Sequence, residues 1–155
     1  MTPEQFNNNA GKLRNLTLRS VRYYEIPSEQ SMWNENGDFD TVSQGLDLIF
    51  DSGPFRITWD NAFWNYGLTV QQGLMVDFLN AALFSSVSEE SRWRVLIGQK
   101  ILNVNVVWEQ LPQGHGQSKG SECYPQSIVI SFDNGKRVFL SAAQFLNDSS
   151  TFFGM

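Results

Sequence analysis

The sequence predicts an α+β fold: one antiparallel sheet built on two similar β-hairpins plus two further strands, with two helices packed on one side. Strand-like runs separated by turn residues and two apolar stripes with helical spacing favour this class. A hydrophobic content of 41% argues against disorder. A chain of 155 residues is most simply one domain. We expect residues 16–155 to form that domain. Residues 1–15 contain three consecutive asparagines, so we expect a flexible N-terminus.

The first strand is expected at residues 15–26 (NLTLRSVRYYEI), which are rich in β-branched and aromatic residues and end before Pro27. A long polar connection over residues 27–45 follows. LDLIF (46–50) and FRITW (55–59) then flank the turn sequence DSGP and predict a hairpin.

The apolar pattern also predicts how this hairpin pairs. A two-residue loop at Ser52–Gly53 would place Phe50 opposite Phe55, and the polar residues would fall on the other face. On this register the side chains of the core face are those of Leu46, Leu48, Phe50, Phe55, Ile57 and Trp59. Pro54 cannot donate the hydrogen bond that would close such a turn.

Two helices are expected next, at about residues 71–85 and 88–97. In the first, apolar residues recur at the spacing of one helical stripe from Leu74 to Leu83. In the second, Trp93 and Leu96 share a face, and Gly98 stands where a helix C-terminus favours a left-handed residue.

The last part of the chain predicts a strand and a second hairpin. Residues 100–111 (KILNVNVVWEQL) alternate in hydrophobicity, which places Leu102, Val104, Val106 and Trp108 on one face. After a polar loop, SIVISF and RVFLS flank the turn sequence DNGK.

The two hairpin regions, residues 46–63 and 128–145, align without a gap. Phe50, Asp51, Gly53 and Phe63 match Phe132, Asp133, Gly135 and Phe145. The match has two explanations: duplication, or convergence on the residues that tight hairpins require. Trp64 aligns with the apolar Leu146, whereas Asp60, Asn61 and Tyr66 have no counterpart of similar chemistry.

Composition argues against several classes of partner. The net charge of −5 is unfavourable for binding nucleic acid. No apolar run is long enough for a membrane helix, and the N-terminus does not resemble a secretory signal, so a cytoplasmic location is expected. The single cysteine, Cys123, excludes an internal disulfide and fits a reducing compartment.

Catalytic signatures are missing from the sequence. His115 lies in a glycine-flanked loop, which is a poor place for a catalytic base, and no phosphate-binding, dinucleotide or zinc motif occurs. Residues 34–40 (NENGDFD) do not fit a calcium loop of the EF-hand type, because Met32 and Ser43 would stand at its first and last positions. We therefore expect no catalytic residue, no cofactor and no metal; an irregular calcium site at Asp38 and Asp40 is the alternative.

Aromatic residues beside carboxylates are the candidate binding groups. Trp33 precedes Asp38 and Asp40 in the long polar connection, and a second group surrounds Trp64. Aromatic side chains in loops are common anchors at interfaces. The complete candidate set is Trp33, Asp38, Asp40, Asp60, Asn61, Trp64 and Tyr66.

The segments VRYYEI, ITWDNAFWNYGL, IGQKILNVNVVWE and YPQSIVISFDNGKRVFLSA resemble a group of small bacterial α+β proteins, some of the kind encoded beside secreted toxins as immunity proteins. The resemblance spans about residues 20–145. It implies a single α+β domain without enzymatic residues and with an acidic surface suited to a partner.

Three functional hypotheses follow. The first is a non-enzymatic protein-binding domain, an immunity-type inhibitor whose acidic face and exposed aromatic side chains occupy a basic site on a toxin. The second is a small-ligand or carbohydrate-binding domain that uses Trp64, Tyr66 and Asp60. The third is a hydrolase with paired carboxylates, drawn from Asp38, Asp40 and Asp60. The sequence leaves the oligomeric state open.

Overall fold

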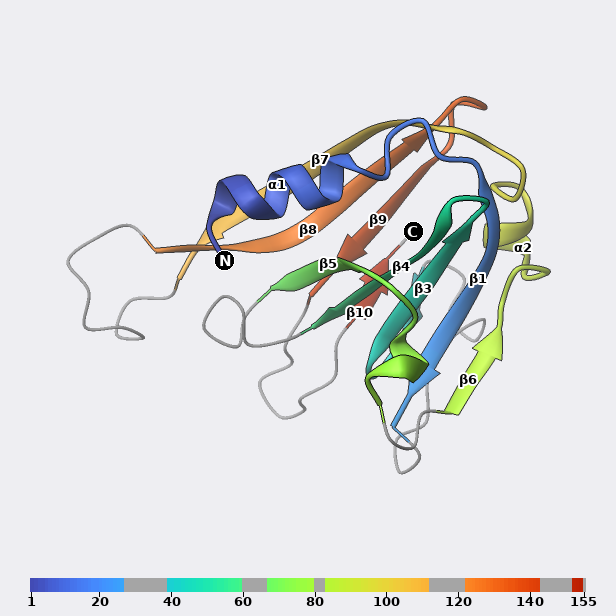
Figure 1. The fold of residues 1–155 in the computed structure, drawn as a ribbon, viewed down its shortest axis with the longest axis horizontal. Helices are drawn as coiled ribbons and strands as arrows, with labels where there is room; N and C mark the ends of the chain where they lie inside the picture. Colours follow the sequence, from blue (N-terminus) through green and yellow to red (C-terminus); the bar gives the residue numbers. More distant parts are fainter. Residues whose placement is uncertain (27–38, 60–66, 80–82, 112–121, 143–151, 155) are drawn as a thin grey trace.

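The fold is described from a computed structural model, which covers residues 1–26, 39–59, 67–79, 83–111, 122–142 and 152–154. Within these ranges the chain forms three antiparallel sheets and two short α-helices (Figure 1). The expected α+β class is confirmed. The single sheet expected from the sequence is not, because the two hairpins lie in different sheets.

The largest sheet has five strands in the order β5-β4-β3-β1-β6. Every neighbouring pair is antiparallel. Its strands are β1 (Leu18–Glu25), β3 (Gly45–Phe50), β4 (Gly53–Trp59), β5 (Leu68–Gln72) and β6 (Leu83–Ser86).

A second sheet has the order β7-β8-β9, and a third pairs β10 with β2. The bounds are β7 (Ile101–Gln110), β8 (Cys123–Phe132), β9 (Arg137–Ser141), β2 (Phe39–Thr41) and β10 (Phe152–Gly154). A β-bulge near the start of β7 shifts its register between Ile101 and Asn103. Ile101 is therefore buried, and Leu102, expected on the inner face, is 56% exposed.

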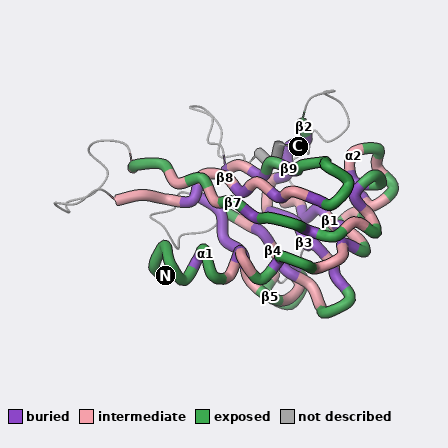
Figure 2. Tube along the Cα trace, turned by 90° about the horizontal axis from the view of Figure 1, so that it is seen from above, coloured by how far each residue is buried: buried purple, intermediate pink, exposed green. Residues whose placement is uncertain are grey.

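The core lies between the five-stranded and three-stranded sheets (Figure 2). Alternate residues of each strand contribute to one hydrophobic cluster, as the two-residue period of a strand requires. The inner face of the larger sheet contributes Val21, Tyr23, Leu46, Leu48, Phe55, Ile57, Leu68 and Val70, and that of the smaller sheet contributes Val104, Ile128, Ile130, Val138 and Leu140.

The N-terminus is a packed helix, which corrects the expectation of a flexible segment over residues 1–15. Helix α1 (Pro3–Gly11) begins with a capping box, in which the Gln5 N–H donates to Thr2 Oγ1 at 3.2 Å and the Thr2 N–H donates to Gln5 Oε1 at 2.8 Å. Phe6 is fully buried and meets Trp108 edge to face at 5.5 Å. Apolar burial therefore fixes a segment whose asparagine content suggested disorder.

The helix expected over residues 71–85 is wrong. Residues 68–72 belong to β5, the described segment from Leu74 to Leu79 contains only the 3₁₀ turn η2 (Met75–Asp77), and β6 begins at Leu83. Gly73 has a φ of +108°, which breaks any helix between strand and turn.

The helix expected over residues 88–97 exists in a shorter form. Helix α2 (Ser91–Arg94) is followed by turns that end at Gly98, where φ is +84°. Trp93 and Leu96 are buried, as their spacing predicts.

The first hairpin has the predicted faces but a register two residues away from the predicted one. Phe50 pairs with Gly53, Leu48 with Phe55, and Leu46 with Ile57. A shift of two preserves which side chains share a face. It also places Trp59 beyond the start of β3, so Trp59 is 37% exposed and not in the core as expected.

A single buried aromatic in α1 tests the packed N-terminus. Replacing Phe6, which is fully buried, with alanine is expected to lower the free energy of unfolding by about 3–5 kcal/mol because it removes a core ring. Asn8→Ala, on the exposed side of α1, should change it by less than about 0.5 kcal/mol. Urea titrations measure both variants. Equal stability of Phe6→Ala and the parent protein would show that α1 does not dock.

Candidate functional site

The outer face of the five-stranded sheet carries an unusual polar group at its centre. Asp47 lies on β3 between two leucines whose side chains point into the core. Its own side chain points to the opposite, outer face of the sheet and is fully buried there. Its Oδ2 accepts a hydrogen bond from the Tyr24 hydroxyl at 2.6 Å, and its Oδ1 accepts one from the Met75 N–H at 3.0 Å. The carboxylate therefore holds η2 against the outer face.

Burial raises the pKa of Asp47 above its ordinary value. Hydrogen bonds from Tyr24 and Met75 and the positive charges of Arg22 and Arg56 oppose that rise without cancelling it. Burial, together with the hydrogen bond to Asp47, also raises the pKa of Tyr24 to about 12. Tyr24 is thus a neutral donor at physiological pH.

Close packing beneath η2 depends on Gly45. A Cβ at this position would lie 2.4 Å from the Ile57 carbonyl oxygen and 3.1 Å from Met75 Sδ. The absence of a side chain at Gly45 therefore lets Met75 bury itself against the sheet.

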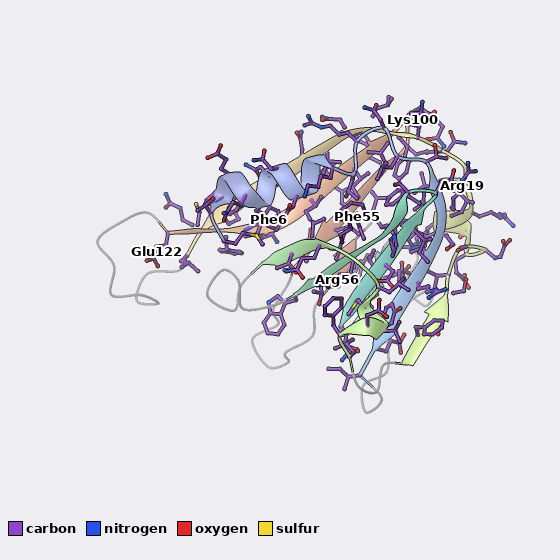
Figure 3. All side chains as sticks on the ribbon, viewed as in Figure 1. Phe6, Arg19, Phe55, Arg56, Lys100 and Glu122 are labelled. Atoms are coloured by element: carbon purple, nitrogen blue, oxygen red, sulfur yellow. The ribbon has the colours of Figure 1, made fainter. Side chains whose placement is uncertain are left out.

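The residue after η2 presents an aromatic ring to solvent. Phe78 is 61% exposed, and the Arg56 guanidinium lies 3.6 Å from the centre of its ring. Arg56 also donates to the Gln72 carbonyl at 2.8 Å and to the Gln71 side chain. In Figure 3, Arg56 can be followed on β4 beside Phe55, whose side chain belongs to the core.

A second arginine–aromatic pair lies near the edge of the same sheet. The Arg22 guanidinium is 4.8 Å from the centre of the Phe84 ring, and Phe84 is 49% exposed. The centres of the Tyr24 and Phe84 rings are 5.7 Å apart. We call Arg22, Tyr24, Asp47, Arg56, Phe78 and Phe84 the arginine–aromatic face.

A hollow of about 250 Å³ adjoins this face on the other side of Met75. Its apolar wall includes Trp59, and the Thr58 hydroxyl donates to the Gln44 carbonyl at 2.7 Å. The buried Gln44 Oε1 has no hydrogen-bond partner among the residues described. The hollow is lined by Ile26, Ser43, Gln44, Thr58, Trp59, Met75 and Leu79.

Of the seven sequence-predicted site residues, only Asp40 falls within the described ranges. It is buried, not displayed on the surface: its Oδ2 accepts a hydrogen bond from the Tyr23 hydroxyl at 2.8 Å, and its Oδ1 lies 3.7 Å from Arg92 Nη1. The Trp93 indole N–H donates to the same tyrosine hydroxyl at 2.6 Å. Trp33, Asp38, Asp60, Asn61, Trp64 and Tyr66 lie outside the described residues.

The buried Tyr23–Asp40 pair joins three elements and has a structural role. Tyr23 comes from β1, Asp40 from β2, and Trp93 and Arg92 from α2. Burial and the negative charge of Asp40 raise the pKa of Tyr23 far above its usual value, so the hydroxyl remains a hydrogen-bond donor.

Sequence reasoning missed the arginine–aromatic face. One signal was available: Asp47 stands alone in the apolar run LDLIF, and a carboxylate inside a strand requires partners when it is buried. Phe78 lies within the apolar stripe from Leu74 to Leu83, which predicts a helix that does not form. Phe84 and Arg22 are far apart in the sequence, and no local pattern pairs them.

In the described part of the chain, no three His, Cys, Asp or Glu side chains gather as a metal site would require. No helix there is both long and apolar enough to cross a membrane. His115 lies outside the described residues, and Cys123 is a partly buried free thiol.

Comparison with protein-family models, with curated proteins and with solved structures found no match for this chain.

The titration of Asp47 gives a test of its environment. A carboxylate with a raised pKa binds more protons in the folded state, so stability falls as pH rises from the ordinary value of 3.8 through the folded pKa. Asp47→Asn keeps an acceptor but cannot ionise. We expect the free energy of unfolding of the parent protein to fall relative to Asp47→Asn over that window. Urea titrations from acidic to neutral pH measure it, and a constant difference would contradict burial of the charge.

Proposed function

We propose that this chain is a small acidic, non-enzymatic protein-binding domain that contacts its partner through the arginine–aromatic face. The observation that carries the proposal is the pairing of two arginines with two exposed phenylalanines, Arg22 with Phe84 and Arg56 with Phe78. Aromatic residues and arginine are enriched at protein interfaces and account for much of their binding energy.

The geometry of the Arg56–Phe78 pair favours binding because it is set before a partner arrives. Asp47 fixes η2, and hydrogen bonds to the Gln72 carbonyl and the Gln71 side chain fix Arg56 beside Phe78. A side chain that is already ordered loses little rotamer entropy on binding. A stacked guanidinium also keeps donors at its rim for a partner's acceptor groups.

Net charge supports a partner of the opposite sign. At −5, the chain would be attracted over long range to a protein of net positive charge, and such attraction raises association rates. Together with the resemblance to immunity proteins, this supports an immunity-type inhibitor of a basic toxin in the cytoplasm. The net negative charge would then attract the basic partner over long range, and the two arginines would contact individual acceptor groups on it.

The second candidate function, a small-ligand or carbohydrate-binding domain, is favoured by the hollow at Trp59. An indole that is 37% exposed at the wall of a 250 Å³ space is suited to stacking on a flat ring or sugar. The volume is below the range of about 300–1,000 Å³ usual for ligand pockets, which favours the protein-binding proposal.

The third candidate, a carboxylate-dependent hydrolase, gains least support. Asp40 and Asp47 are buried carboxylates with tyrosine partners, and such environments fit structural roles. Asp38 and Asp60 lie outside the described residues.

Affinity capture tests the protein-binding proposal. Immobilised parent protein is expected to retain a specific partner from a lysate of its own source cells, and Phe78→Ala and Phe84→Ala should each weaken retention by about tenfold or more. Both rings are exposed, so stability should change little. Quantitative mass spectrometry of the retained proteins measures the outcome.

Phe139→Ala is the matched control. This phenylalanine is also exposed, at 42%, and also lies near an arginine, Arg137, but it belongs to β9 of the other sheet. It should retain the partner as the parent does. Recovery of no specific protein, or equal loss with all three variants, would overturn the proposal.

A further inference from the structure

Strand β6 is the last strand of the five-stranded sheet and lies beside the arginine–aromatic face. Within the ranges that the structure describes, β6 pairs with β1 alone, so its other side is an open edge there (Figure 1). Natural proteins usually protect such edges with charged residues or proline. The sequence of β6, LFSS, contains neither.

The outward backbone groups of β6 belong to Phe84 and Ser86. Val87 donates its N–H to the Val21 carbonyl at 3.0 Å, so its backbone points toward β1. Backbone direction alternates along an antiparallel strand, and the register Arg22↔Ser86 and Tyr24↔Phe84 therefore directs these two residues away from β1. Among the described residues, neither makes a backbone hydrogen bond on that side.

The side chains along this edge define what could lie against it. Phe84 presents its exposed ring on the outer face, with Arg22 over it. Ser86, directly opposite Arg22, is small, so a long side chain on a neighbouring strand could reach across it to the guanidinium. The charge of Arg22 acts on the buried Asp47, but no described carboxylate lies within ion-pair distance of its guanidinium.

We propose that β6 accepts an extended segment of the protein partner as a sixth, antiparallel strand of this sheet. The segment has the pattern acidic–any–apolar: its carboxylate lies opposite Ser86 and reaches Arg22, and its apolar side chain lies opposite Phe84. Main-chain hydrogen bonds to Phe84 and Ser86 supply affinity, and the two side chains supply selectivity. This inference rests on the proposed protein-binding function and specifies its mode.

A second copy of the chain fits the edge less well. It would place Ser86 opposite Phe84 and offer no carboxylate to Arg22. Pairing through two outward-facing residues buries far less surface than a stable interface, which needs about 1,200 Å² or more. Two copies also repel each other, since each carries a net charge of −5. A partner can add contacts on the arginine–aromatic face, which a copy joined through β6 alone would not.

Synthetic peptides provide the probe. Acetyl-Thr-Glu-Thr-Leu-Thr-amide carries the proposed pattern and is expected to shift the amide NMR signals of Phe84 and Ser86 and to slow their hydrogen exchange. Methylating the glutamate nitrogen removes a backbone donor that faces β6 and should weaken binding by about tenfold. Methylating the central threonine nitrogen, which faces away, should not.

Variants test the same contacts from the protein side. Ser86→Pro removes an outward N–H at a position where an edge strand tolerates proline, and should abolish peptide binding, whereas Ser86→Ala should preserve it. Arg22→Gln should remove the preference for the glutamate peptide over its glutamine analogue. The methylated peptides need no variant, so the test holds even if Ser86→Pro fails to fold.

Several results would overturn the inference. One is an absence of NMR shifts at Phe84 and Ser86, and another is equal binding of both methylated peptides. A third is a dimer by light scattering that becomes monomeric in Ser86→Pro, because that result would assign the edge to a second copy. Capture of the cellular partner separates the two proposals. If Ser86→Pro folds and still captures the partner while Phe84→Ala does not, strand addition is wrong and the protein-binding function stands.

Discussion

The outer face of this protein depends on one buried carboxylate. Asp47 sits in the middle of β3, where its neighbours on the strand point into the core, and a charge there has no access to water. Its position is tolerable because Tyr24 and the Met75 N–H satisfy its oxygens and two arginines lie near enough to favour its ionised form. The same bonds decide where η2 lies, and hence where Phe78 meets Arg56. The hydrogen bonds that compensate for the buried charge thereby also arrange the arginine–aromatic face, which we propose as the binding surface.

Sequence patterns predicted the strands well where burial alone determined them. The alternation in β3 and β4 predicted which residues face the core, with the exception of Trp59, since a strand has only two faces. Register was less accessible: a slip of two preserves those faces, and only Trp59 reveals the difference. The helix over residues 71–85 failed because apolar spacing cannot show that Gly73 adopts a positive φ or that Gln72 completes a strand opposite Phe55. By contrast, α1 was visible in principle, because Thr2, Pro3 and Gln5 form a standard N-terminal signal.

The two similar hairpins illustrate how little a shared turn motif specifies. In the first, Phe50 pairs with Gly53 and the loop is Asp51–Ser52. In the second, the Phe132 N–H donates to the Lys136 carbonyl, so the loop is longer and Gly135 takes a φ of +82°. The aligned aspartates also differ, since Asp51 pairs with Arg19 whereas Asp133 accepts the Lys100 N–H. Different turns, partners and sheets favour convergence over duplication as the origin of the likeness.

The candidate site was hard to find from sequence because its members meet only through sheet order. Arg22 and Phe84 are far apart in the chain and become neighbours because β6 pairs with β1. Arg56 and Phe78 meet because β5 turns back at Gly73, where a Cβ would lie 3.1 Å from Arg56 Nη1. Each arginine is thus placed by a long-range contact. The loop aromatics Trp33, Trp64 and Tyr66, by contrast, were predicted as binding residues from local composition alone. Composition indicates that a chain has groups suited to binding, but topology decides which of them share a surface. Among the described residues this shared surface adjoins the edge strand β6. Under the proposed protein-binding function, side chains and main chain would therefore contact the same partner.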